Sequence, residues 1–324
     1  MGHSAPGPIP LFVNNSKLVR VWGRGPQRVQ GRALAFLLSM GLSGRATDAY
    51  EGAMSTPDLP KLRDVIARHG LDARKSLGQH FLLDPNLTGR IARLAGDLAG
   101  RHVIEVGPGP GGLTRALLET EAAEVLAVEI DSRAVAAIEE LRAAFPDRLR
   151  LLEADAVGTD LAALVPAPRQ IVANLPYNVA TPLLIGWLRQ AASWERLTLM
   201  FQLEVAERVC AAPGSAAYGR LAVLAQWTCT ASLLLRIPPA AFTPPPKVFS
   251  AVVGLVPLPE QPAPALFAAM ERLTAAAFGQ RRKMLRGALR PLGGEALLER
   301  AGIAPDRRAE TLSIAEFDRL ARLL

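Results

Sequence analysis

One segment restricts the possible folds more than any other: the apolar run His102–Val106 leads directly into the glycine-rich sequence GPGPGGLT. The residues that follow, Leu113 to Leu118, have the composition and spacing of a helix. A short buried strand, a tight glycine turn and a helix form the first half of a βαβ unit. The sequence therefore predicts an α/β fold with this turn at the carboxyl end of a strand.

Other segments repeat the alternation of strand and helix. Helices are expected from Leu87, at 134–144 and at 204–210, and strands at 124–128, 149–153, 171–173 and 197–202. A strand pair, 232–237 and 250–256, is expected on either side of the proline-rich FTPPPKV. This alternation predicts a doubly wound, Rossmann-like parallel sheet that binds its ligands outside the carboxyl ends of the strands.

Composition divides the chain into three parts. Residues 1–53 are rich in arginine and poor in acidic residues, and Met54 looks like a start, so 1–53 are expected to be a disordered extension, with an organelle transit peptide as the alternative. Residues 54–256 are expected to form the α/β domain. The linker PLPEQPAPA then leads into a helical pattern, so 257–324 are expected to form a small all-helical domain.

Composition also excludes several classes of protein. Two cysteines without CxxC spacing and four scattered histidines predict neither a disulfide framework nor a metal site. No apolar stretch reaches the roughly 20 residues of a membrane span. We therefore expect a metal-free protein of the cytoplasm that does not enter a membrane.

The glycine loop, read alone, matches the dinucleotide fingerprint GxGxxG, with the acidic Glu129 about twenty positions on. Pro108 and Pro110 argue against a dinucleotide, because proline has no N–H to donate to a pyrophosphate. A ligand without phosphates, S-adenosylmethionine, loses little from their absence. Glu129 would accept from its ribose diol and Asp155 from its adenine amino group, while Gly107 lets the main chain approach.

The sequence QIVANLPYN at 170–178 ends the fourth strand of this series with an amide, a proline and an aromatic ring. A simple strand–turn–helix junction is the plainer interpretation. If the cofactor donates a methyl group, the oxygen of Asn174 and a main-chain carbonyl near Pro176 would instead hold an exocyclic adenine amine. Tyr177 would stack on the base and Phe242 would form a second wall. Asn178 is expected to cap the following helix.

The chain resembles the family of small-subunit ribosomal RNA adenine N6,N6-dimethyltransferases from about Lys75 to its end. The resemblance rests on motifs that follow one another in the same order: KSLGQHFLLD, VIEVGPGPGGLT, VEID, the turn at Asp155, NLPYNVATPLL, FQLEVAERVCAAPGSAAYGRL, FTPPPKVFSAVV, AFGQRRKMLRGAL and RRAETLSIAEFDRLA. It implies cofactor contacts at His80, Leu82, Gly107, Glu129, Asp155 and Asn174. The family more often has Asn where this chain has His80.

The resemblance also implies a substrate. Two methyl groups would be transferred to N6 of each of two adjacent adenosines near the 3′ end of small-subunit (16S) rRNA, within a pre-30S particle and by a monomeric enzyme. The basic run Arg281-Arg282-Lys283 is expected to contact rRNA phosphates, with a solvated helix face as the alternative.

Three other functions compete with this one. The nearest is the related enzyme class that methylates a large-subunit rRNA adenine. A non-catalytic RNA-binding protein on the same fold is the second, and the intact Asn174-Leu175-Pro176-Tyr177 argues against it. An NAD-linked dehydrogenase is the third, and the two loop prolines argue against it.

Overall fold

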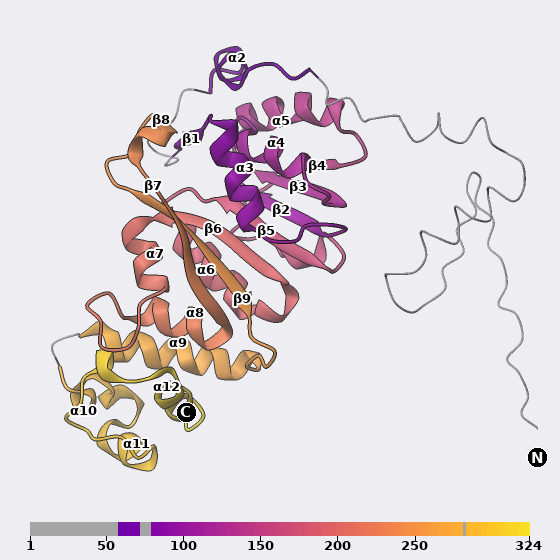
Figure 1. The fold of residues 1–324 in the computed structure, drawn as a ribbon. Helices are drawn as coiled ribbons and strands as arrows, with labels where there is room; N and C mark the ends of the chain where they lie inside the picture. The colour runs from indigo at the N-terminus through magenta and orange to yellow at the C-terminus, as the bar shows by residue number, and fades with distance from the viewer. Residues whose placement is uncertain (1–57, 72–78, 281–282) are drawn as a thin grey trace, which may run out of the picture. The chain divides into compact units, whose positions relative to one another are not determined.

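A computed structural model describes residues 58–71, 79–280 and 283–324 (Figure 1). The predicted N-terminal extension, 1–53, lies outside these residues. So do Arg281 and Arg282 of the predicted RNA-binding run and the first residues of the KSLGQHFLLD motif.

Most of the strands belong to one seven-stranded sheet in the order β4-β3-β2-β5-β6-β9-β7. Its strands are β2 (His102–Val106), β3 (Glu124–Glu129), β4 (Leu149–Glu153), β5 (Arg169–Asn174), β6 (Arg196–Gln202), β7 (Cys229–Ile237) and β9 (Ser250–Pro257). The first five in spatial order are parallel to one another, which is the arrangement that alternating strands and helices predict. The predicted α/β, Rossmann-like fold class is confirmed.

The remaining two strands differ from a purely parallel sheet. β9 lies between β6 and β7 and pairs antiparallel with both, from Leu197↔Leu255 on one side to Ile237↔Ser250 on the other. The predicted strand pair is therefore present. It extends the main sheet at one edge, because β9 returns toward β6 after the proline-rich loop.

Helices cover both faces of the sheet (Figure 1). On one face α3 (Pro85–Leu94), α4 (Gly112–Leu118) and α5 (Ser132–Ala144) pack on a buried layer that includes Val103, Val125 and Val172. On the other face α6 (Ala180–Arg189) and α8 (Arg220–Thr228) pack on a layer that includes Ile104 and Leu126. The sheet is thus buried on both faces, and the polar residues predicted to bind ligands lie at its carboxyl edge.

The described chain after β9 is helical, with α9 (Pro264–Gly279), α10 (Leu285–Ala288), α11 (Gly294–Arg300) and α12 (Ile314–Ala321). Single 3₁₀ turns occur at Leu161–Ala163, Ala191–Ser193, Pro239–Ala241, Arg290–Leu292 and Ala309–Thr311. Met270 and Phe317 of the C-terminal helices share one buried cluster with Ile104 of the sheet. The division into domains at residue 257 therefore stays a prediction.

A small second sheet positions the site. β1 (Phe81–Leu82) pairs antiparallel with β8 (Phe242–Thr243), in the register Phe81↔Thr243 and Leu82↔Phe242. This pairing joins the segment before α3 to the loop between β7 and β9, two parts of the chain about 160 residues apart in sequence.

Two short helices remain: α2 (Leu62–Arg68) and α7 (Leu203–Val209). Within the described residues, no helix combines the length and the apolar character needed to cross a membrane.

Candidate active site

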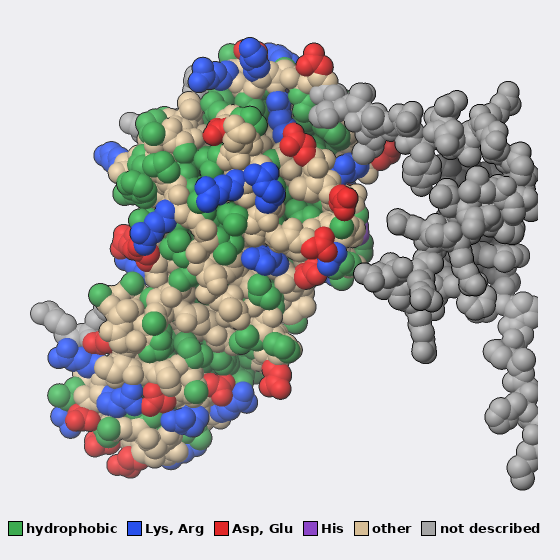
Figure 2. Space-filling view, viewed as in Figure 1, with side chains coloured by type: hydrophobic (Ala, Val, Ile, Leu, Met, Phe, Trp, Pro, Cys, Tyr) green, Lys and Arg blue, Asp and Glu red, His purple; other side chains and the backbone are tan. Residues whose placement is uncertain are grey.

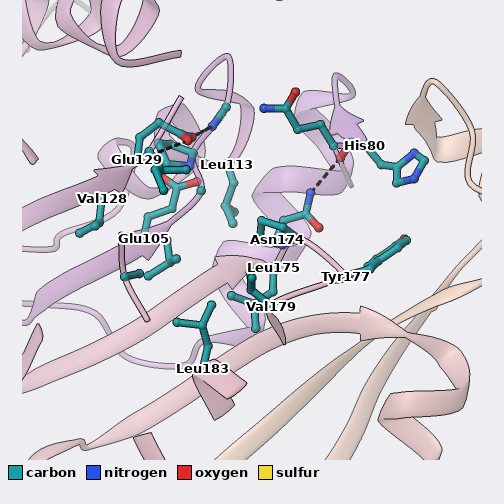
Figure 3. Close-up of a pocket in the computed structure, with 18 of the residues that line it drawn as sticks. His80, Glu105, Leu113, Val128, Glu129, Asn174, Leu175, Tyr177, Val179 and Leu183 are labelled. Carbon is teal, nitrogen blue, oxygen red and sulfur yellow. Dashed lines mark hydrogen bonds between the residues drawn. The ribbon is translucent and has the colours of Figure 1, made fainter. Parts of the chain in front are cut away.

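A cavity opens at the carboxyl ends of β2, β3, β4 and β5 (Figure 3). The loops that follow these strands form its wall, together with the segment around β1. All the predicted cofactor contacts line it, and so do two further residues predicted to be catalytic: His80, Leu82, Gly107, Glu129, Asp155, Asn174, Pro176 and Tyr177. An open α/β sheet binds its ligands at this edge.

The glycine loop has main-chain angles that favour glycine, and it lies so close to β1 that a side chain would clash there. Gly107, Gly109 and Gly111 have φ of +70°, +55° and +90°, which residues with a side chain rarely adopt. At Gly112 a Cβ atom would lie 2.3 Å from the carbonyl oxygen of Leu82 in β1. The last two glycines of the motif therefore differ in purpose, since Gly111 permits the turn and Gly112 permits the close approach of β1.

Glu129 ends β3 and is 6% exposed. Its Oε1 accepts hydrogen bonds from the N–H groups of Ile130 (2.8 Å) and Asp131 (2.9 Å), and its Oε2 accepts one from Gly109 (3.2 Å). Burial raises the pKa of Glu129, although these three N–H groups oppose the shift. The carboxyl group thus fastens the glycine loop to the end of β3, a role that was not predicted from the sequence.

Asp155 lies in the loop after β4 and is exposed. Its Oδ1 accepts a hydrogen bond from the N–H of Val157 at 2.9 Å, which holds the carboxylate in a tight local turn at the rim of the cavity. A carboxylate at this position can accept a hydrogen bond from an amino group of a ligand.

A second buried carboxyl group, Glu105 of β2, also lines the cavity and was missed in the sequence analysis. It is 1% exposed, and no described group hydrogen-bonds to its Oε2. Burial raises its pKa to about 8, and the nearby charge of Glu129 adds to the shift. The signal was available in the sequence, as a single acidic residue inside the apolar run HVIEV.

Asn174 ends β5, and its amide is oriented by a main-chain group from β1's side of the cavity. Its Nδ2 donates a hydrogen bond to the carbonyl oxygen of His80 at 3.1 Å (Figure 3). This bond fixes the direction in which the amide faces, and the amide oxygen is the atom that can accept a hydrogen bond from a ligand.

The residues after Asn174 line the cavity, and some of them also form the first hydrogen bonds of α6. The carbonyl of Pro176 accepts from the N–H groups of Val179 (3.2 Å) and Ala180 (3.1 Å), so it belongs to the start of α6. The main-chain carbonyl expected near the proline is therefore assigned to Leu175, which lines the cavity. Asn178 is exposed, and α6 begins after Val179 with no side-chain cap, so the predicted capping by Asn178 is wrong.

Tyr177 and Phe242 occupy different environments. The hydroxyl of Tyr177 lies 2.7 Å from Oγ of Ser250, and burial raises the pKa of Tyr177. Phe242 is 3% exposed, belongs to the buried layer around α3 and α4, and is not among the residues that line the cavity. Its predicted role as a wall for the acceptor base therefore has no direct contact with the cavity to support it.

Among the described residues, no cluster of three or more His, Cys, Asp or Glu side chains could hold a metal ion. Lys283 is exposed at the start of the α10 region, while its two predicted partners, Arg281 and Arg282, lie outside the described residues.

Comparison with known proteins shows which family the chain belongs to. A family model described as ribosomal RNA adenine dimethylase matches residues 70–324. The chain is 69% identical over 265 residues to "Ribosomal RNA small subunit methyltransferase A" of Gluconobacter oxydans, which covers 82% of this chain and 88% of that protein. A protein of the same name from Paramagnetospirillum magneticum is 60% identical over 268 residues, covering 82% and 95%.

Solved structures agree with this match. A dimethyladenosine transferase from Plasmodium falciparum has a TM-score of 0.64 at 26% identity and covers 74% of this chain and 96% of its own. The 23S rRNA methyltransferase ErmE has a TM-score of 0.57 at 26% identity and covers 75% and 98%.

Proposed function

The chain belongs to the ribosomal RNA adenine dimethylase family, and we propose that it transfers methyl groups from S-adenosylmethionine to N6 of two adjacent adenosines near the 3′ end of small-subunit rRNA. The observation that carries this proposal is the orientation of the Asn174 amide by the carbonyl of His80. It leaves an amide oxygen at the edge of a cavity that the glycine loop and Glu129 also line.

The choice of the small subunit rests on the degree of similarity. Relatives named for the small subunit are 60% and 69% identical to the chain, whereas the large-subunit enzyme ErmE is 26% identical. Both enzyme classes share the fold, so the fold alone does not separate them.

The lining of the cavity fits S-adenosylmethionine better than a dinucleotide. Pro108 and Pro110 offer no N–H to a phosphate, and the carboxyl group of Glu129 disfavours an anionic ligand. S-adenosylmethionine has no phosphate, and when bound it supplies a methyl group on a positively charged sulfur. We expect calorimetric titration to show that the protein binds S-adenosylmethionine and does not bind NAD.

Individual residues would hold the cofactor in the following way. Glu129 would accept from the ribose and Asp155 from the adenine amino group. Gly107 would let the main chain lie against the ligand, and Leu82 of β1 would also border it. His80, which lines the cavity just before β1 and whose carbonyl orients Asn174, would also contact the cofactor.

The acceptor amine would be held by two oxygens. N6 of adenine is a poor nucleophile because its lone pair is delocalised into the ring. The amide oxygen of Asn174 and the carbonyl oxygen of Leu175 would each accept one N–H hydrogen, which turns the nitrogen lone pair toward the methyl group. Stacking on Tyr177 would fix the plane of the base. The contribution of these residues is positioning and electrostatic stabilisation.

The substrate would be rRNA inside an assembling small subunit in the cytoplasm, bound by a monomer. Looped-out bases of single-stranded segments are what proteins read in RNA, and they suit a cavity at the edge of a sheet. The helical region 257–324 would contact rRNA phosphates through Arg281, Arg282 and Lys283.

The test compares purified, unmethylated small and large subunits as acceptors of a labelled methyl group. We expect label only in the 3′-terminal fragment of small-subunit rRNA. Asn174→Ala should lower kcat about 10²- to 10³-fold, the usual effect of removing one polar group that acts in the transition state. Gln190→Ala, which removes an exposed amide at the end of α6 outside the cavity lining, is the matched control and should retain activity. Label confined to the large subunit would contradict the proposal.

A further inference from the structure

Asp131 lies two residues after Glu129, where β3 ends and α5 begins. Its carboxylate caps α5 by accepting a hydrogen bond from the N–H of Arg133 at 3.2 Å. Its own N–H donates to Oε1 of Glu129 at 2.9 Å. Asp131 is only 8% exposed, so its position is set by these contacts and not by solvent. A shift of Asp131 would therefore also shift the hydrogen bond that orients the carboxyl group of Glu129.

The guanidinium of Arg133 folds back onto the same carboxylate. Its Nε donates to Oδ1 of Asp131 at 3.1 Å, and its Nη2 donates to Oδ2 at 2.7 Å. A two-point contact of this kind fixes the direction of both side chains. These hydrogen bonds are the main reason that the pKa of Asp131 lies below its usual value.

The Asp131–Arg133 pair also contacts the N-terminal part of the described chain at two points. Nη1 of Arg133 donates to the carbonyl oxygen of Gly70, shortly after α2, at 2.5 Å. Nε2 of Gln79 donates to Oδ2 of Asp131 at 3.1 Å. Gln79 itself lines the cavity, two residues before β1. The pair thus connects a residue of the cavity wall to the start of α5.

An apolar cluster accompanies these polar contacts where α2 lies next to α5 (Figure 1). Its buried residues are Val65, Leu71, Phe81, Ala134 and Ala137. Phe81 of β1 also lies against the glycine loop, because a Cβ atom added at Gly109 would be 2.9 Å from its ring. The N–H of Gly109 in turn donates to Glu129. The start of α5, β1 and the glycine loop therefore pack together around one end of the cavity.

From these contacts we infer that Arg133 and Asp131 are positioning residues for the cofactor, which act through Glu129 and Gln79. Neither side chain is part of the cavity lining, so neither would touch the ligand. Together they would keep two parts of the cavity wall in place before the ligand arrives, which lowers the cost of ordering the site on binding. This rests on the proposed function and deepens it, because the cofactor named there is the ligand whose affinity would depend on the pair.

Arg133→Ala removes the guanidinium and leaves Asp131 to cap α5. We expect the Kd for S-adenosylmethionine, measured by calorimetry without RNA, to rise about 10- to 100-fold, the usual effect of removing a group that orients a ligand-binding side chain. At saturating cofactor, kcat and the KM for small subunits should stay at the wild-type values, since the occupied cavity no longer depends on the pair for its shape. A general loss of folded protein would instead lower kcat and the stoichiometry of cofactor binding.

Two further variants test whether the two residues act as one unit. Asp131→Asn keeps an oxygen that can cap α5 but loses the charge and one acceptor, so it should weaken cofactor binding as Arg133→Ala does. The double variant should bind no more weakly than either single variant, because both substitutions break the same contact. Arg133→Lys keeps the charge and loses the two-point contact, so its Kd should lie between those of wild type and Arg133→Ala. It also provides the comparison where Arg133→Ala does not fold.

Arg142→Ala is the matched control. Arg142 lies on the same helix, forms an ion pair with the exposed Glu139, and is outside the cavity lining, so its removal should leave cofactor affinity unchanged. Three results would overturn the positioning role: wild-type affinity in Arg133→Ala, equal losses in Arg133→Ala and Arg142→Ala, or additive losses in the double variant. A wild-type protein that does not bind S-adenosylmethionine would instead overturn the proposed function.

Discussion

Burial of the Glu105 carboxyl group disfavours its charged form, and this should make the free energy of unfolding of the free protein depend on pH. Burial raises its pKa from 4.5 to about 8. Below about pH 4.5 the group is protonated in both folded and unfolded chains. Between pH 4.5 and 8 the unfolded chain loses the proton while the folded protein keeps it, so this group makes stability fall as pH rises. Above pH 8 the penalty is constant.

Glu105→Gln removes this titration while keeping the shape of the side chain. We expect its free energy of unfolding to exceed that of wild type at pH 8 by about 2–5 kcal/mol, with the difference disappearing toward pH 4.5. Urea unfolding between pH 4.5 and 9, without cofactor, measures this. Glu153→Gln, an exposed residue of β4, is the control and should follow wild type at every pH. If the curves of Glu105→Gln and wild type run parallel, Glu105 is not the group responsible.

Residues at the ends of strands could be predicted from the sequence, because the edge of a parallel sheet brings strand ends together whatever the details of packing. This reasoning found Gly107, Glu129, Asp155 and Asn174, all of which line the cavity. Side-chain direction could not be predicted in the same way. The inward position of Glu105 and the burial of Phe242 depend on contacts between β2, β8 and the helices above them.

At the scale of elements, the contact between α4 and β1 depends on a missing side chain. Gly112→Ala would bring its Cβ to 2.3 Å from the Leu82 carbonyl oxygen, so β1 or the start of α4 must move. We expect this variant to be destabilised by about 1–3 kcal/mol, as for other overpacked sites, and to bind S-adenosylmethionine more weakly because β1 borders the cavity.

Gly186→Ala is the matched control for this prediction. Gly186 lies within α6, and a Cβ atom there would meet nothing within 4 Å. Alanine should stabilise the helix by about 0.5–1 kcal/mol and leave cofactor affinity unchanged. Thermal unfolding and calorimetric titration of the two variants measure both effects. Equal stability of the two variants would show that β1 accommodates the added methyl group.

The bounds of elements followed from the sequence where an apolar run ended at charged or turn-forming residues. The strands at 102–106 and 149–153 have the predicted bounds, and the strand predicted at 171–173 extends to Arg169–Asn174. The helices α2 and α8 were not predicted, and α6 was expected only as a helix without bounds. The position of β9 between β6 and β7 could not be predicted either, since it depends on pairing between segments distant in sequence.

At the scale of the whole molecule, the site and the basic residues lie on different parts of the fold. The site is at the carboxyl edge of the parallel strands, while Lys283, Arg286 and Arg290 are exposed around α10. Figure 2 shows basic and acidic side chains interspersed over the end of the molecule formed by the C-terminal helices. Charge sign alone therefore does not define an RNA surface there, and the pairing of each basic residue has to be considered.

These three basic residues differ from several of their neighbours in the ion pairs that they form. Arg307 pairs with Glu316, and Arg322 pairs with Asp318 at 2.7 Å. Lys283, Arg286 and Arg290 make no ion pair with a carboxylate of the described chain, so they can bind phosphates without first breaking one. An exposed, unpaired cation releases counterions from RNA on binding, and this makes affinity depend on salt.

The triple substitution Lys283→Ala, Arg286→Ala and Arg290→Ala tests this surface. Affinity for small subunits should fall, and the slope of log affinity against log salt should become shallower by about 2–3, since each lost phosphate contact removes roughly 0.7–0.9. Cofactor affinity should not change, because the surface is separate from the cavity. Arg63→Ala, Arg90→Ala and Arg93→Ala remove the same charge from α2 and α3 and should leave the slope as in wild type. If both triple variants flatten the slope equally, the effect comes from net charge, and the α10 surface has no special part in binding rRNA.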